Sequence, residues 1–216
     1  MAQVNVAGGS SLYLINDATE HNKVIGVFCQ LDASVDVPRI EDFYRTGVAA
    51  RIIRSFTLPD GTTAIILQSL SRIHLDEILR INPYRRGRVT RLDDELPAPD
   101  DKEFQVLVGA CQEATTELLR LAEPPREDAV FAMRNIHNPV FLANFICTNM
   151  PLPLADKDKL IQEDSLYQRT YRLMQVLGRE VQFARLKRDI QNQTHEELDQ
   201  QQKEYFIQQQ IKNIQN

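Results

Sequence analysis

The sequence of 216 residues has no tryptophan and only 8 glycines, 10 prolines and 3 cysteines. So few glycines disfavour a turn-dense β-sandwich. Cys29, Cys111 and Cys147 are far apart and form no C-x-x-C pair, which indicates a reducing compartment. No run of 18 apolar residues occurs, and residues 1–11 lack the basic and apolar regions of a signal peptide. We therefore expect a cytoplasmic protein without a membrane partner.

Motifs of enzymes and nucleic-acid binders are also missing. The net charge of −5 disfavours a general nucleic-acid binder, which needs excess Lys and Arg. The Gly-rich stretch 7–11 lacks the lysine of a phosphate-binding loop, and His195-Glu196 is not followed by the second histidine of H-E-x-x-H. No G-x-S-x-G occurs, and Cys29 and Cys147 lie in apolar runs typical of core residues. We predict no catalytic, cofactor or metal site in this chain.

The first half carries the strand signals. Residues 24–29 form a short apolar run, and a helix is expected before it, from Ser10 or Ser11 to about Glu20. Residues 47–56 and 62–70 flank Leu58-Pro-Asp-Gly61, which predicts a β-hairpin. Residues 71–79 and 84–92 predict a further pair of strands. Strands in this order predict an antiparallel sheet that closes into a small barrel.

The second half is helical. An acidic, proline-marked boundary at residues 93–101 precedes predicted helices over about 104–119, 127–136, 139–148 and 155–162. From Ser165 no proline occurs, and a heptad-like stripe typical of coiled coils follows: Tyr167, Thr170, Met174, Leu177, Val181 and Ala184. We expect an α+β fold in three parts: a β-rich lobe (1–96), a helical lobe (97–186) and an extended helix (187–216).

The extended helix is too polar to bury itself. Between Lys187 and Asn216, seven residues are apolar and nine are Gln. Such a helix projects into solvent or packs on another chain or domain. It also lacks a stop signal at its end, so we expect the natural chain to continue.

A basic cluster, residues 85–91 with Tyr84, has two interpretations. It could contact nucleic acid. It could instead protect an exposed strand edge by its charge, and the adjacent acidic residues 93–95 favour this second interpretation.

Several motifs resemble the N-terminal region of ATP-dependent Lon proteases. Gly47-Val-Ala-Ala-Arg-Ile52, Leu58-Pro-Asp-Gly-Thr62 and a strand ending in Arg72 are similar to the family's central hairpin, with Ser69 where the family commonly has Gly. Ile136-His-Asn-Pro139 resembles a helical motif, and residues 199–215 resemble the stretch that precedes the ATPase module. The family's opening L-P-L-L-P-L-R strand is not seen, so the resemblance implies that this first strand is missing.

The resemblance implies a non-catalytic substrate-recognition and assembly region with a β pseudo-barrel lobe, a helical lobe and a long C-terminal helix. It implies a parent serine endopeptidase with a Ser-Lys dyad and an AAA+ motor that uses ATP and Mg²⁺, while this chain holds no cofactor. The implied partners are unfolded or damaged proteins and other Lon subunits in a homo-hexamer. The alternative is a stand-alone adaptor that binds proteins or ligands.

Four residues are candidates for substrate contact. Leu198 and Tyr205 lie seven apart on one face of the long helix and match family positions that face the substrate entrance. They could equally be seam residues of a coiled coil. Ile81 and Tyr84, with Pro83, could form an apolar patch at a loop tip, or could belong to a simple turn.

Overall fold

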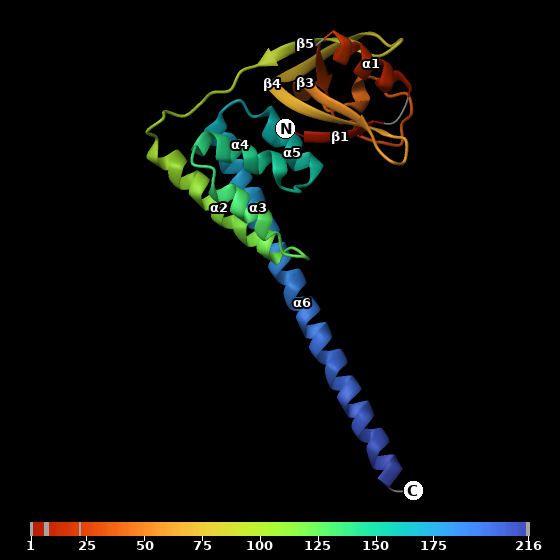
Figure 1. The fold of residues 1–216 in the computed structure, drawn as a ribbon. Coiled ribbons are helices and arrows are strands. Elements are labelled where there is room, and N and C mark those ends of the chain that lie inside the picture. The colour runs from red at the N-terminus through yellow and green to blue at the C-terminus, as the bar shows by residue number, and fades with distance from the viewer. Residues whose placement is uncertain (1, 7–8, 22, 215–216) are drawn as a thin grey trace. The chain divides into compact units, whose positions relative to one another are not determined.

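A computed structural model describes residues 2–6, 9–21 and 23–214. Five strands precede most of the helices (Figure 1). The strands are β1 (Ala2–Val6), β2 (Val24–Val27), β3 (Thr46–Thr57), β4 (Thr63–Arg80) and β5 (Arg86–Leu92). The helices are α1 (Gly9–Glu20), α2 (Lys102–Leu121), α3 (Glu127–Arg134), α4 (Pro139–Asn149), α5 (Leu154–Gln162) and α6 (Leu166–Ile214), with a 3₁₀ turn η1 (Ile40–Asp42).

The chain divides into two compact units. Unit 1 comprises Met1–Leu96 and Pro153–Leu166, and unit 2 comprises Pro97–Leu152 and Tyr167–Asn216. The first segment of unit 1 ends at Leu96. Residues 153–166, which the sequence analysis grouped with the helical lobe, belong instead to the unit that holds the sheet.

The β3–β4 hairpin forms where the sequence predicts it. Gly61 has a positive φ of 84°, which other residues rarely adopt, so the turn requires it. The Asp60 carboxylate accepts hydrogen bonds from the Thr62 amide (2.9 Å) and hydroxyl (2.7 Å). The turn chemistry of Pro, Asp and Gly therefore sets the register of the hairpin.

The predicted break near residue 70 does not exist, because β4 runs unbroken for 18 residues. Its first part pairs with β1 and its second part with β5, while β3 pairs along most of its length on the other side. The strand order is β1-β4-β3-β2, and all pairs are antiparallel. Among the described residues no ladder joins β2 to β1 or β5, so the sheet stays open there.

One face of this sheet is covered by α1. Ile15 and Ala18 of this helix are buried against Ala50, Ile65 and Leu67 of the sheet. β2 lies so close to β3 that a Cβ at Gly47 would overlap the Val27 carbonyl oxygen. A side chain at this position would therefore push the two strands apart.

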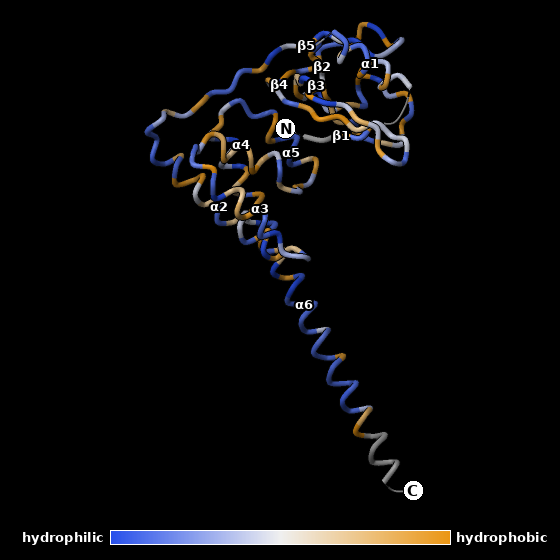
Figure 2. Tube along the Cα trace, viewed as in Figure 1, coloured by the Kyte–Doolittle hydropathy of each residue, from blue (hydrophilic) through white to orange (hydrophobic). Residues whose placement is uncertain are grey.

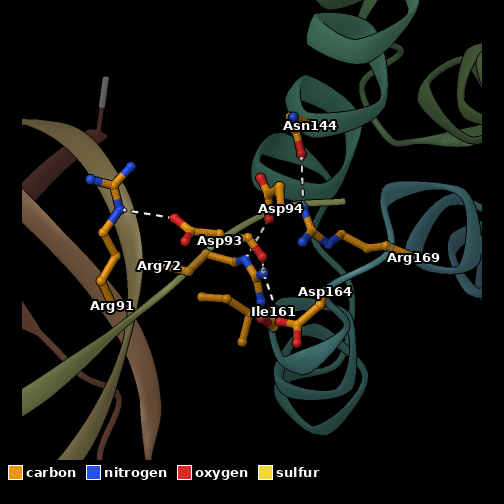
Figure 3. Close-up of polar contacts among 8 residues, drawn as sticks. All are labelled: Arg72, Arg91, Asp93, Asp94, Asn144, Ile161, Asp164 and Arg169. Atoms are coloured by element: carbon orange, nitrogen blue, oxygen red, sulfur yellow. Dashed lines mark hydrogen bonds and ion pairs between the residues drawn. The ribbon is translucent and has the colours of Figure 1, made fainter. Parts of the chain in front are cut away.

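Residues 153–166 are held in unit 1 by a buried arginine (Figure 3). The Arg72 guanidinium donates to the carboxylates of Asp94 (2.7 Å) and Asp164 (2.8 Å). It also donates to the carbonyls of Ile161 (2.8 Å) and Asp93 (3.0 Å). Backbone bonds add to these contacts: the Glu95 amide donates to Asp164, and the Leu166 amide donates to Glu95. Arg72 thus ties the end of the sheet region to the segment that leads into α6.

Unit 2 is a small helical bundle. Asp101 caps α2 and Asn138 caps α4, each accepting from a backbone amide three residues later at 2.9 Å. The Asn138-Pro139 pair of the Lon-like motif is therefore a helix start, with proline in the first turn. Buried α2 residues pack toward α6, where the Cys111 thiol lies 3.6 Å from the Thr170 carbonyl oxygen. Burial raises the pKa of Cys111 to about 12, which agrees with a core role for this thiol.

The buried stripe of α6 is shifted from the predicted one. Thr170, Leu177 and Val181 are buried as predicted. Tyr167 and Met174 are only half-buried, and the residues just before them, Leu166 and Leu173, are fully buried in their place. From residue 185 to 207 every residue is exposed. This part of α6 is largely hydrophilic, with isolated hydrophobic residues (Figure 2). Within the described ranges, no helix combines the length and apolarity needed to cross a membrane.

Candidate functional site

Unit 2 contains a groove with a largely apolar lining. Its volume is about 640 Å³. The end of α2, the helices α3 and α4, and the α6 residues just after the bundle contribute its walls. Its apolar lining combines buried and accessible side chains: Leu118, Leu119, Ala129, Met133, Phe145, Ile146, Met150 and Phe183.

The lining combines buried and exposed apolar side chains. Met133 and Ile146 are each 1% exposed, whereas Phe183 is 67% exposed. Thr115 also lines the groove, and its buried hydroxyl has no hydrogen-bond partner. A buried hydroxyl without a partner is costly, so Thr115 is an energetically unfavourable point in the wall of the groove. A groove with this composition suits a polypeptide with large apolar side chains.

The charged residues of the groove are unevenly paired. Arg126 pairs with Asp128 at 3.6 Å, and Glu180 pairs with Arg179 at 3.4 Å. For Lys187, Arg188 and Glu123, which also line the groove, the described residues provide no ion pair. Two adjacent cations therefore stand on the α6 wall.

One side of α6 continues the direction of the groove. Successive residues of an α-helix are rotated by about 100°, so Leu198 and Tyr205 project from the same side as the groove-lining Lys187 and Gln191. Between residues 191 and 205 this side is uncharged, and we call it the neutral face: Gln191, Thr194, Leu198, Gln201, Gln202 and Tyr205. The charged residues of the stretch project from the rest of the circumference: Glu196, Glu197, Asp199, Lys203 and Glu204.

The two predicted contact residues on α6 are both accessible. Leu198 is 51% exposed and Tyr205 is 64% exposed. Phe183 lies about 33 Å before Tyr205 at 1.5 Å per residue. The groove and the neutral face thus follow one another along one side of α6, the groove with charged residues at its walls and the neutral face without them.

The two predicted contact residues in unit 1 differ from each other. Ile81 is 56% exposed, but Tyr84 is buried, with 8% exposure. The Tyr84 hydroxyl donates to the Asp17 carboxylate and accepts from Arg86 at 2.8 Å. The Arg86 guanidinium also lies 5.2 Å from the centre of the Tyr84 ring. Tyr84 therefore links α1 to the start of β5 and does not form a surface patch with Ile81.

The basic cluster is paired within unit 1. Arg88 contacts Glu77 at 2.9 Å, Arg91 contacts Asp93 at 3.1 Å, and Arg85 donates to the Pro38 carbonyl at 3.2 Å. β5 pairs only with β4 among the described strands, and most of it is exposed. The arrangement agrees with a strand edge protected by charge.

The prediction that Cys29 is a core residue is wrong, because Cys29 is exposed, and Cys147 is half-buried. Of the Gly-rich stretch 7–11, residues 7–8 lie outside the described residues, and α1 begins at Gly9. In the part of the chain that the structure describes, no three His, Cys, Asp or Glu side chains gather as a metal site would require.

No motif in the sequence predicts the groove. Its walls come from four helices that are distant in sequence, so no local motif marks it. One signal was present: Phe183 and Leu186 lie off the predicted heptad stripe, which indicates a second apolar surface on α6.

Solved structures define the class of this fold. The Lon N-terminal domain protein from Xanthomonas campestris matches with a TM-score of 0.54 and 19% identity, over 80% of this chain and 87% of that one. The N-terminal domain of the Mycobacterium avium complex Lon protease matches with a TM-score of 0.60 and 15% identity, over 82% and 89%. The chain therefore has the α+β fold of Lon N-terminal domains, as predicted.

Sequence comparisons then give the family. The model of the ATP-dependent protease La (LON) substrate-binding domain matches residues 1–179. Lon proteases of Parabacteroides distasonis and Porphyromonas gingivalis are 43% and 40% identical over 95% and 98% of this chain. The chain belongs to the Lon substrate-binding domain family, which confirms the resemblance seen in its motifs. It spans 25% of the length of these two relatives.

Proposed function

We propose that this chain selects unfolded or damaged proteins for an ATP-dependent serine endopeptidase. Membership in a substrate-binding family and the identity to Lon proteases support this role. The activity belongs to the whole protein: a Ser-Lys dyad, an AAA+ motor that uses ATP and Mg²⁺, and a homo-hexamer in the cytoplasm. The chain itself contributes recognition and assembly and no catalysis.

The observation that carries the proposal is the continuity of the groove with the neutral face. An unfolded client has no fixed surface, but it exposes apolar side chains and peptide groups. The groove offers an apolar hollow for side chains, and Gln side chains on the neutral face can hydrogen-bond peptide groups of any sequence. Leu198 and Tyr205 add apolar contacts between these amides. Such a surface tolerates many sequences, as a quality-control receptor requires.

The test uses the full-length protease. Changing Leu198→Ser together with Tyr205→Ser is expected to slow ATP-dependent degradation of casein several-fold, because both contacts with the client are lost. Ile207→Ser is the matched control, since Ile207 is also exposed (58%) but projects from the other side of α6. Equal casein turnover by the double variant and the control would remove the neutral face from the proposal.

A second measurement separates client contact from self-association. Leu198 and Tyr205 could instead be the seam of a coiled coil between two copies. In that case the double variant would change the sedimentation behaviour of the 216-residue chain and leave its affinity for labelled casein unaltered. The chain alone, incubated with ATP and casein, is expected to hydrolyse neither.

A further inference from the structure

Two adjacent cations lie on the α6 side of the groove, and their charge affects which client segments can bind there. Lys187 and Arg188 stand side by side on α6, at the passage from the groove to the neutral face. Arg188 also lines a neighbouring hollow of about 620 Å³ together with Arg120 and Arg134. An apolar client segment in the groove would place its flanking residues beside these cations.

Pairing with nearby acids decides how much of this positive charge is available. Arg120 contacts Glu127 at 3.2 Å, and Glu117 of the same hollow accepts from Arg185 at 2.5 and 2.8 Å. Those charges are largely offset. Among the described residues, Lys187 and Arg188 have no such partner, and neither does Arg134.

Two acids of the lining are also unpaired in the described chain. Glu123 lines the end of the groove formed by α2, and Glu113 lines the neighbouring hollow. Each is a single acid, Glu113 on α2 and Glu123 just after its end, whereas Lys187 and Arg188 are adjacent on the α6 wall. The net charge of −5 acts from farther away and is screened beyond about 8 Å at physiological ionic strength. The other lining acids, Asp128 and Glu180, are paired with Arg126 and Arg179, so Lys187 and Arg188 are the two adjacent cations without an ion pair among the described residues of the lining.

We propose that the groove and the cations at its α6 wall select apolar client segments flanked by acidic or neutral residues, and reject segments flanked by lysine or arginine. This inference rests on the proposed function and deepens it. The apolar side chains enter the groove beside Phe183, which is 67% exposed. Flanking carboxylates approach Lys187 and Arg188, whereas flanking cations are repelled. Beyond these cations, the neutral face imposes no further charge preference.

The test compares three labelled peptides with the same core of four large apolar residues. Two Glu, two Gln or two Lys residues flank the core on both sides. Fluorescence anisotropy with the 216-residue chain is expected to give acidic-flanked peptides about tenfold tighter binding than basic-flanked ones, with the neutral peptide between them. The difference should vanish in 1 M NaCl, where the Debye length is about 3 Å.

Charge reversal supplies the decisive comparison. Lys187→Glu with Arg188→Glu is expected to invert the order of the three peptides. The matched control, Lys102→Glu with Lys203→Glu, changes the net charge equally on exposed helix positions outside the groove lining, and should preserve the order. Equal affinities for the three peptides, or an order that survives Lys187→Glu with Arg188→Glu, would overturn the charge selectivity.

Three further outcomes distinguish this inference from the proposed function. If the neutral peptide binds and Phe183→Ser weakens it, but charge has no effect, the groove binds clients and only the selectivity is wrong. If no peptide binds, the groove is not a client site and the inference fails with it. If the chain instead dimerises through the groove, so that Phe183→Ser abolishes the dimer and peptides do not compete, the occupant is a second copy.

Discussion

The buried arginine of unit 1 allows a quantitative prediction. The Arg72 side chain is 9% exposed, and it donates four hydrogen bonds of 2.7–3.0 Å. Replacing it with methionine keeps much of the side-chain volume but removes all four bonds. Breaking a buried ion pair by deleting one partner costs about 3–5 kcal/mol. The carboxylates left behind regain water, because Asp94 and Asp164 are 34% and 55% exposed. We therefore expect the lower end, about 3 kcal/mol.

Urea unfolding of the 216-residue chain measures this loss, and hydrogen exchange assigns it to unit 1. The two units can unfold separately, so the overall transition alone is not sufficient. The amides of Glu95 and Leu166 donate to Asp164 and Glu95, next to the arginine, and should exchange much faster in the variant.

Arg91→Met is the matched control for this experiment. Arg91 and its partner Asp93 are 74% and 84% exposed, so losing their ion pair should cost less than about 1 kcal/mol. If Arg72→Met costs no more than Arg91→Met and leaves the exchange of Glu95 and Leu166 unchanged, the reasoning about the Arg72 contacts is wrong.

Two further predictions concern the sheet and α1. Gly47→Ala should lower the free energy of unfolding by about 2 kcal/mol, because its Cβ would overlap the Val27 carbonyl, and urea titration measures this. The control Gly109→Ala, in open space on α2, should raise it by up to about 1 kcal/mol; a loss at Gly109 equal to that at Gly47 would contradict the steric explanation. The hydrogen bond from Tyr84 and that from Lys23 hold the pKa of Asp17 at about 2, below its usual 3.8. Asp17 therefore contributes stability above pH 4 that is lost as the pH falls through 2, and an NMR titration of Tyr84→Phe should show this pKa raised. An unchanged Asp17 pKa in that variant would show that the hydroxyl is not its main partner.

Local patterns in the sequence were sufficient for much of the fold. The hairpin turn at Leu58–Gly61 was predictable because only a few residue types favour its backbone conformation. The helix starts at Asp101 and Asn138 were close to their predicted places, because a side-chain cap satisfies amides only three residues away. The family resemblance was visible for the same reason, since its motifs are short and contiguous.

Other features depended on partners distant in sequence. No break occurs in β4 near residue 70, because β3 spans that point and the sequence offers neither proline nor glycine to end the strand. The helical pattern of residues 153–166 predicted that they belong to the helical lobe. The buried guanidinium of Arg72, about 90 positions earlier, holds Asp164 and its neighbours to the sheet instead.

In the candidate site, too, some features follow from local sequence and others depend on partners distant in sequence. The sequence alone determined that the end of α6 is polar and that Leu198 and Tyr205 share one of its faces, because helical periodicity is a local property. Only the tertiary structure decided that Tyr84 is buried by a carboxylate of α1, and that Phe183 borders a groove made by four helices. Periodicity fixes which side chains share a face of one helix. What that face meets is fixed by the packing of segments that the sequence keeps apart.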